Sequence, residues 1–407
     1  MAATPTRFSF QKLAYLLICL CIVLGVLYAG SSIFIPLTFG MLFAFMLKPL
    51  CDRLERITGN RVVAIVVSLI AIVSVIGAVL AFFGLQISSV LAQSDDIAVR
   101  LEQAVFDAVN YLGGLFNLTS AEINRMMNNN INGLIRQPLN LLTTGLTTSG
   151  YVIGNVLLTV IYTFFFLLYR TAIRRFAMSQ LKPTTRDEGE RTMREVQRVA
   201  SSYLAGMLTV MLVLGVLNSL GLYFIGIQYA LLWGFLAALL AVIPYIGTTL
   251  GGLLPLLYAI ATTGTLWQPV AVIVLYASVQ TLEGNFITPK VVGNSVKINA
   301  LAAVLSLLFG AAFWGLPGLI LAIPLLAMVR IVMEHMVATQ PIALLLSDDL
   351  YDHSDLYVTE YSKPKYRLYN LFKTKRAPVV VKKSPAAEIT YQVGQPDPEV
   401  VTDAEPQ

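Results

Sequence analysis

Residues 203–247 read YLAGMLTVMLVLGVLNSLGLYFIGIQYALLWGFLAALLAVIPYIG. They belong to a run of 84 residues, 199–282, that contains no Asp, Glu, Lys or Arg. A helix that crosses a bilayer needs roughly 20 apolar residues, so this run has room for three or four crossings. A second uncharged run, of 32 residues, lies between Lys297 and Arg330. A transmembrane β-barrel is excluded, because its strands would alternate in segments of about ten residues.

The composition of the whole chain agrees with this reading. Of its 407 residues, 57% are hydrophobic and only 13% are charged, whereas an ordinary soluble domain carries about 25% charged residues. The sequence therefore predicts an all-α polytopic membrane protein with about eight transmembrane helices, plus one or two re-entrant or broken helices. The three cysteines, Cys19, Cys21 and Cys51, lack the spacing of a disulfide framework or a metal site. We expect no metal and no cofactor.

The N-terminal part, residues 1–85, holds three predicted transmembrane helices, at about 13–28, 35–50 and 62–85. The first has too long an apolar region for a typical cleaved signal peptide and lacks a clear cleavage site. Residues 86–149 form an amphipathic helical segment, because Ile97, Leu101 and Ala104 share one helical face.

Residues 150–340 form the predicted C-terminal transmembrane core. It begins with a span at about 151–169, continues with a solvated helix at 184–200, and has a fifth span at about 203–225. Two apolar runs with internal breaks follow, at 230–262 and 267–282, and the run 298–333 is long enough for a hairpin of two passes. Residues 341–407 are polar, and we expect a disordered tail there.

The distribution of Lys and Arg predicts the orientation. The N-terminus, the loop 48–61 and the loop 170–200 carry two, four and eight basic residues, whereas the segment 86–149 has three. Basic loops stay in the cytoplasm. Both termini are therefore predicted to be cytoplasmic and 86–149 extracytoplasmic. The net charge of +5 reflects this asymmetry, so nucleic acid is not an expected partner.

Sequence signatures of enzymes are missing. The chain has no G-x-x-x-x-G-K-[ST] phosphate loop, no H-E-x-x-H metal motif and no G-x-S-x-G nucleophile elbow. No Asp lies inside a predicted span, which argues against an intramembrane aspartyl protease. We therefore expect a protein that is not an enzyme.

A broken helix is the first candidate for function. Pro244, Tyr245 and Gly247 interrupt the apolar run 230–262. The backbone groups that such a break frees must meet protein or water, and breaks of this kind mark substrate sites in many transporters. The alternative is a proline kink between two packed helices.

A polar group that follows the longest uncharged run is the second candidate. Glu283 ends that run, and an ionisable residue near membrane depth is a functional hypothesis by default. The alternative is that its carboxylate simply reaches water at the interface. The predicted substrate or ion path therefore has two parts. The first is the helix break at Pro244, Tyr245 and Gly247. The second comprises Gln280, Glu283, Asn285, Pro289 and Lys290.

These motifs, taken in order, resemble the autoinducer-2 exporter family of bacterial membrane proteins. The resemblance rests on Tyr203-Leu-Ala-Gly206, Gly226-Ile-Gln-Tyr229-Ala230, Ile243-Pro244-Tyr245-Ile246-Gly247, Gln280-x-x-Glu283-Gly284, Pro289-Lys290-Val291-Val292-Gly293 and Ala322-Ile323-Pro324. It covers roughly residues 10–340. The sequence departs from the family where Asn299-Ala300 replaces an expected His-Pro pair.

The resemblance implies a secondary transporter of the bacterial cytoplasmic membrane that works without ATP hydrolysis. Such a protein would move a small polar solute like autoinducer-2, or exchange a monovalent cation for protons. Its partners would be the lipid bilayer and that solute or ion, and glycine-rich helices would permit a homo-oligomer. The alternative is a membrane scaffold that transports nothing and binds partners through its outer segment and its tail.

Overall fold

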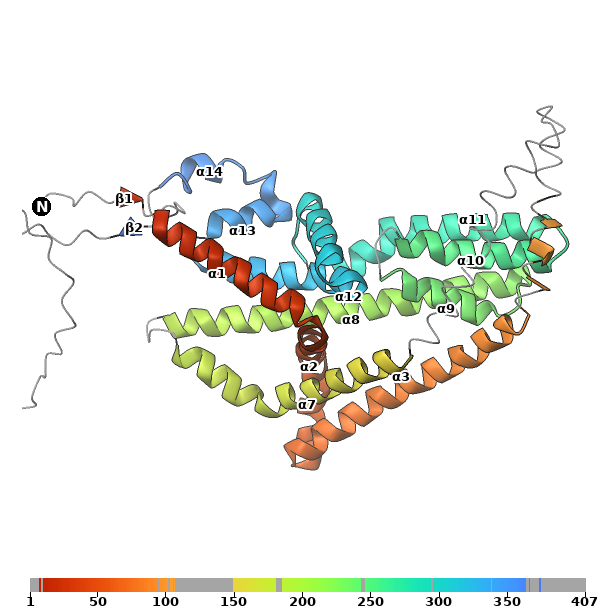
Figure 1. Ribbon diagram of the computed structural model, residues 1–407, viewed down its shortest axis with the longest axis horizontal. Coiled ribbons are helices and arrows are strands. Elements are labelled where there is room, and N and C mark those ends of the chain that lie inside the picture. Colours follow the sequence, from red (N-terminus) through yellow and green to blue (C-terminus); the bar gives the residue numbers. More distant parts are fainter. Residues whose placement is uncertain are drawn as a thin grey trace, which may run out of the picture.

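The computed structural model describes residues 7–8, 10–93, 96–97, 99–101, 103–104, 106, 149–180, 185–242, 246–293, 296–337, 339–363, 366 and 373–374. Nearly all of the described chain is helical (Figure 1). Six helical stretches are long and apolar enough to cross a bilayer, which confirms the predicted all-α polytopic fold. These are Ser31–Thr58 (α2), Arg61–Leu91 (α3), Ile153–Ser179 (within α7, Ser149–Ser179), Arg186–Ile225 (α8), Trp267–Val291 and Ala300–His335 (α12).

The first two helices are joined by one residue. Helix α1 (Phe10–Ala29) is followed by Gly30, and α2 starts at Ser31. Helix α2 is longer than the sequence predicted, so the basic residues from Lys48 to Arg56 lie on a helix and not in a loop. It stops at Gly59, whose φ of +65° suits glycine, and the side chain of Asn60 then caps α3.

Helix α8 is one continuous helix of 40 residues. The sequence predicted two elements here, a solvated helix at 184–200 and a span at 203–225. No Gly or Pro stands between Glu190 and Ala205, so nothing interrupts the backbone where the polar part meets the apolar part. At a rise of 1.5 Å per residue, α8 is about 60 Å long. It therefore extends well beyond a hydrocarbon core of about 30 Å.

Helices α9 (Ala230–Leu240) and α10 (Ile246–Thr262) form an antiparallel hairpin. A Cβ atom on Gly247 would lie 1.7 Å from the carbonyl oxygen of Leu240, and one on Gly251 would lie 2.9 Å from Cα of Ala237. With 11 residues, α9 spans only about 16 Å, which is roughly half the hydrocarbon thickness. The hairpin thus has the dimensions of a re-entrant element.

The long helix α12 also folds back on itself. Its backbone leaves helical geometry at Gly315, where φ is +64° and ψ is −138°. Two glycines on opposite arms then touch, because a Cβ on Gly318 would lie 1.9 Å from the carbonyl oxygen of Gly310. At the open end of this hairpin the Arg330 guanidinium donates to the carbonyl oxygen of Lys297 at 2.6 Å. The two-armed hairpin expected within 298–333 is therefore present.

Part of the region that the sequence predicted to be a disordered tail, after residue 340, is helical. Helices α13 (Gln340–Leu346) and α14 (Leu356–Thr359) follow α12. The side chain of Asn299 accepts from the backbone N–H of Ala302 and so caps α12, while its amide donates to the carbonyl oxygen of Leu345 at 2.7 Å. Strand β1 (Arg7–Phe8) pairs with β2 (Lys373–Thr374) in an antiparallel ladder. Of the predicted tail, 364–365, 367–372 and 375–407 lie outside the described residues.

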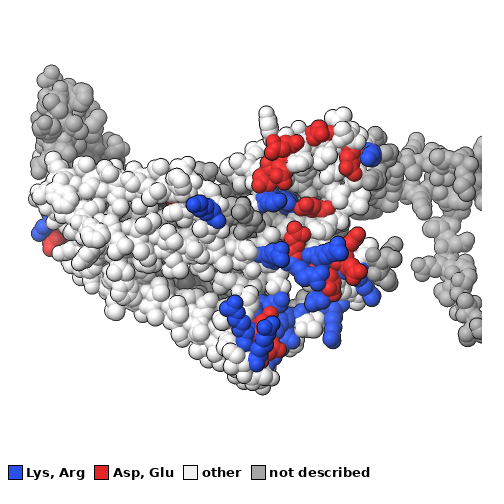
Figure 2. All heavy atoms as spheres, turned by 180° about the vertical axis from the view of Figure 1, so that it is seen from behind, with Lys and Arg blue, Asp and Glu red and all other residues white. Residues whose placement is uncertain are grey.

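The largest apolar core cluster and most of the charged side chains lie at different ends of the molecule (Figure 2). The largest core cluster joins the end of α3 to α8, α9, α10 and α11 (Trp267–Leu282), and includes Ile97 and Leu101 from the predicted amphipathic face. Most of the segment 86–149, from residue 107 to 148, lies outside the described residues. Figure 2 shows Lys, Arg, Asp and Glu gathered over the other end on the face it displays. This polarity is what a bilayer imposes on a spanning protein.

The contact between the two arms of α12 leads to a test. We expect Gly318→Ala to lower the free energy of unfolding by about 1–3 kcal/mol, because the new methyl group meets a backbone carbonyl that cannot move independently. The matched control is Gly77→Ala in α3, where the added methyl group meets nothing within 4 Å. Thermal unfolding in detergent measures both. Equal melting temperatures for the two variants would contradict the close contact.

Candidate solute path

The residues of the predicted helix break are only partly described. Pro244 and Tyr245 lie outside the described residues. Gly247 lies in the first turn of α10, is buried, and packs against the last turn of α9. The side chain of any other residue would collide there with the Leu240 carbonyl. Gly247 therefore allows the two arms of the hairpin to approach each other.

The second predicted group lies where α11 widens. Two π-helical stretches, η3 (Glu283–Ile287) and η4 (Pro289–Gly293), continue α11. Such wide turns often occur at functional positions. Glu283 is partly buried, and its carboxylate has no hydrogen bond or ion pair with the described residues. The other members, Gln280, Asn285, Pro289 and Lys290, are exposed on the surface of this chain.

Apolar neighbours of Gly247 and of Glu283 lie together in one core cluster. Val279 of α11 shares a core cluster with Ala238 of α9, and Ala241 and Ile287 pack against the same cluster. Ala241 also faces Gly247. The end of α9, the start of α10 and the π-helical stretch are therefore side by side against α8. The exposed polar side chains of the second group point away from this contact.

Four buried polar side chains near this contact have no hydrogen-bond partner in the described chain. Asn218 and Ser219 of α8 are 4% and 8% exposed, yet the Oδ1 and Oγ atoms are unpaired. The indole Nε1 of Trp233 on α9 and the hydroxyl of Tyr276 on α11 are unpaired as well. All four belong to the uncharged run 199–282. Sequence reasoning missed them, although Asn218-Ser219 is an amide and hydroxyl pair in an otherwise apolar stretch.

Glycines bring these polar groups against the hairpin. A Cβ on Gly234 of α9 would lie 2.3 Å from Oγ of Ser219, and one on Gly252 of α10 would lie 3.2 Å from the ring of Tyr276. An unpaired polar group buried in an apolar setting costs about 1–3 kcal/mol. Where α8 and α11 pack on the hairpin, the interface therefore contains polar atoms that have no hydrogen-bond partner in the described chain.

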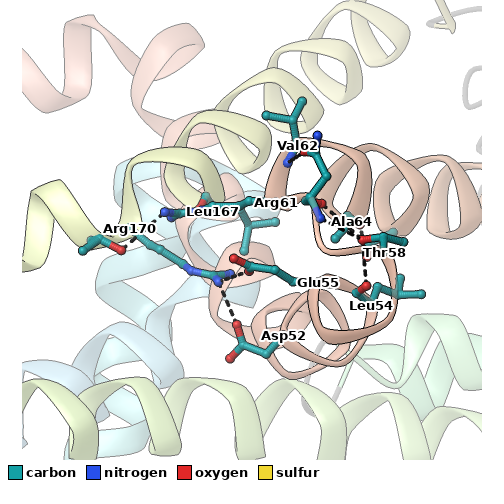
Figure 3. Close-up of polar contacts among 12 residues, drawn as sticks. Asp52, Leu54, Glu55, Thr58, Arg61, Val62, Ala64, Leu167 and Arg170 are labelled. Carbon is teal, nitrogen blue, oxygen red and sulfur yellow. Dashed lines mark hydrogen bonds and ion pairs between the residues drawn. The ribbon is translucent and has the colours of Figure 1, made fainter.

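At the charged end, one ion-pair network ties three helices together (Figure 3). Arg170 of α7 contacts Asp52 at 2.9 Å and Glu55 at 2.5 Å, both on α2. Arg61, at the start of α3, donates to the carbonyl oxygen of Leu167 at 2.7 Å. The network anchors the turn between α2 and α3 to α7.

A cavity of about 830 Å³ opens beside this network, between α2, α7 and the polar part of α8. Its walls combine apolar side chains such as Phe45 and Phe166 with charged ones such as Lys48 and Arg170. The cavity therefore offers a mixed polar and apolar surface at the charged end. In the described part of the chain, no group of three or more His, Cys, Asp or Glu is placed to hold a metal ion.

Comparison with known proteins identifies relatives over most of the chain. Residues 17–338 match the AI-2E family transporter profile. The chain is 24% identical over 352 residues to TqsA, the AI-2 transport protein of Escherichia coli K12, covering 86% of this chain and 99% of TqsA. It is 27% identical over 314 residues to YrrI of Bacillus subtilis 168, a protein provisionally named a transport protein, covering 75% of this chain and 87% of YrrI.

The ion-pair network gives a testable prediction. We expect Arg170→Gln to lower the free energy of unfolding by about 1–3 kcal/mol, because two neighbouring carboxylates lose their shared cation. The matched control is Arg174→Gln, whose side chain is 56% exposed in its pair with Glu190. A triple variant that also carries Asp52→Asn and Glu55→Gln should recover most of the loss. Thermal unfolding in detergent measures all three, and a triple variant no more stable than Arg170→Gln would contradict this account.

Proposed function

The chain belongs to the AI-2E transporter family, and on this premise we propose that it is a secondary transporter or exporter of the bacterial cytoplasmic membrane. The proposed cargo is a small, neutral, polar solute such as autoinducer-2, the compound for which the relative TqsA is named. The other candidate activity is exchange of a cation for protons, and Glu283 is the observation that favours it. A membrane scaffold that transports nothing is the remaining alternative.

The observation that carries the proposal is the set of unpaired polar groups between α8, α11 and the α9–α10 hairpin. Asn218 presents an amide, Ser219 and Tyr276 present hydroxyls, and Trp233 presents an N–H. Donors and acceptors of this kind match a solute that carries several hydroxyl groups. No charged side chain stands in 199–282, which favours a neutral solute over an ion at this position.

We propose that the α9–α10 hairpin moves relative to α8 to admit the solute. The contact between α8 and α9 is made through glycines, including Gly215 against Phe235 and Gly234 against Ser219. Small residues at these positions let the two helices approach each other closely. The solute would then replace the missing hydrogen-bond partners, and its release would let the hairpin close again.

The proposed orientation follows the positive-inside rule, with both termini in the cytoplasm and 86–149 outside. The pairing of Arg7–Phe8 with Lys373–Thr374 supports a common side for the two ends of the chain. In this orientation the 830 Å³ cavity is the cytoplasmic entrance for the solute. Membrane-impermeant thiol labelling of a cysteine at position 120, in a background without the three native cysteines, should succeed from outside.

A substitution at Asn218 should affect solute flux and protein stability in different ways. We expect Asn218→Leu to reduce solute flux at least about tenfold, because the solute loses a hydrogen-bonding partner. The same change should leave the melting temperature equal or higher, because an unpaired buried amide is removed. The assay is autoinducer-2 flux in proteoliposomes, with Thr209→Val, an exposed position on α8, as the control. If Asn218→Leu transports as fast as wild type, Asn218 is not part of the solute site. If wild-type protein transports none of the tested solutes, the result favours the scaffold alternative.

Glu283 tests whether an ion gradient drives the flux. If its carboxylate binds a cation or exchanges a proton, Glu283→Gln should insert normally but lose the dependence of flux on pH or cation gradient. The control is Glu188→Gln, on the polar part of α8. Flux should be followed in proteoliposomes under imposed proton and sodium gradients. A Glu283→Gln variant that transports normally under every gradient would make Glu283 an interfacial anchor.

A further inference from the structure

A second cavity, of about 570 Å³, lies between the polar part of α8 and the open end of the α12 hairpin. Arg194 and Glu195 of α8 line it, together with Arg191 and Arg198 one turn away on either side. Lys297 and Arg330 complete it from the α12 hairpin. Five cations and one carboxylate thus converge on one cavity from two distant parts of the sequence.

Two of the nearby carboxylates, Glu190 and Glu334, are already paired with arginines, and among the described residues Glu195 contacts only a histidine ring. Glu190 contacts Arg174 at 2.8 Å and Arg194 at 3.2 Å. Glu334 contacts Arg330 at 2.8 Å. Glu195, the acid that lines the cavity, lies 3.6 Å from the ring of His335.

Three of the five cations make no ion pair with the described residues. The side chains of Arg191, Arg198 and Lys297 have no ion pair or hydrogen bond to any described residue. Like charges that share one cavity repel each other, and the repulsion is stronger near a low-dielectric protein surface than in bulk water. An anion bound among them would offset this repulsion.

The fold fixes where the backbones of these residues lie, and it also holds the side chain of Arg330. Arg191, Arg194 and Arg198 are three or four residues apart, so they share one face of α8. Arg330 is only 9% exposed, and its guanidinium donates to the Lys297 carbonyl oxygen at 2.6 Å. That hydrogen bond fixes the start of α12 beside the end of its second arm. The cavity therefore has one buried, hydrogen-bonded cation, Arg330, and exposed cations on α8 and at Lys297.

We propose that this cavity binds a phosphate-bearing anion. Guanidinium groups match phosphate oxygens with pairs of N–H donors, and an ammonium group adds a compact positive charge. The ligand could be a phosphorylated solute from the cytoplasm or the headgroup of an anionic phospholipid, since basic pockets between transmembrane helices also hold such headgroups. The proposal does not depend on transport, and its test uses binding alone.

The first arm of the experiment uses inorganic pyrophosphate as the probe. Isothermal titration of the full chain in an uncharged detergent should detect binding, and the double variant Arg191→Gln/Arg198→Gln should weaken it about tenfold or more. The matched control is Arg53→Gln/Arg56→Gln, which removes two exposed cations from α2 that line neither cavity. The control should bind as wild type does.

The second arm uses lipid nanodiscs that contain phosphatidylglycerol and phosphatidylcholine in equal amounts. Native mass spectrometry counts the phosphatidylglycerol molecules that stay bound. A lipid ligand predicts retention that the Arg191→Gln/Arg198→Gln variant loses and that pyrophosphate displaces. A soluble ligand predicts equal lipid retention in all variants, with pyrophosphate binding still lost in the double variant.

The proposal fails if the two double variants behave alike in both arms, or if wild type binds neither pyrophosphate nor phosphatidylglycerol. If the cavity double variant does not fold, Lys297→Gln replaces it, because the Lys297 side chain is exposed and its carbonyl contact with Arg330 is kept. A weakening of about threefold or more is expected from this single change. Unchanged binding in Lys297→Gln would also overturn the proposal.

Discussion

The hydrocarbon interior of a bilayer offers no partner to a backbone N–H or C=O group, and the architecture follows from that constraint. The uncharged run 199–282 must satisfy its backbone groups internally, so it forms helices. Where a helix ends at depth, other parts of the protein must cover the end. The end of α9 and the start of α10 meet this condition because they pack against each other, and the end of α9 also packs against α8 and α11.

Glycines allow other backbone segments to pack closely against helix ends and chain reversals. Gly247 lets α10 approach the last carbonyl groups of α9, and Gly318 does the same for the two arms of α12. These contacts join backbones directly and involve few interlocking side chains. Small residues allow the close helix approach on which such contacts depend. The unpaired Oδ1 of Asn218, buried on α8, costs about 1–3 kcal/mol of stability in this arrangement.

Much of this architecture could be predicted from the sequence, because hydropathy and helix-breaking residues act locally. The spans, the break near Gly247 and the reversal within α12 all follow from local composition. The continuity of α8 was missed because a change from polar to apolar residues looks like a boundary, although nothing in the backbone chemistry requires one there. Asn218 and Ser219 were missed because a pattern cannot tell which face of a hydrophobic helix meets another helix.

The feature least predictable from the sequence was the meeting of residues that lie far apart along the chain. Lys297 and Arg330 stand 33 residues apart, and only the reversal at Gly315 brings them together beside α8. Helix α8 then links two regions of different chemistry. It carries Arg194 in the basic cavity and Asn218 against the hairpin, 24 residues or about 36 Å away. Because α8 is one unbroken helix, a shift of its polar part along the helix axis would also displace Asn218 relative to α9. Any effect of the anion on solute flux would therefore require α8 to remain one helix between these positions.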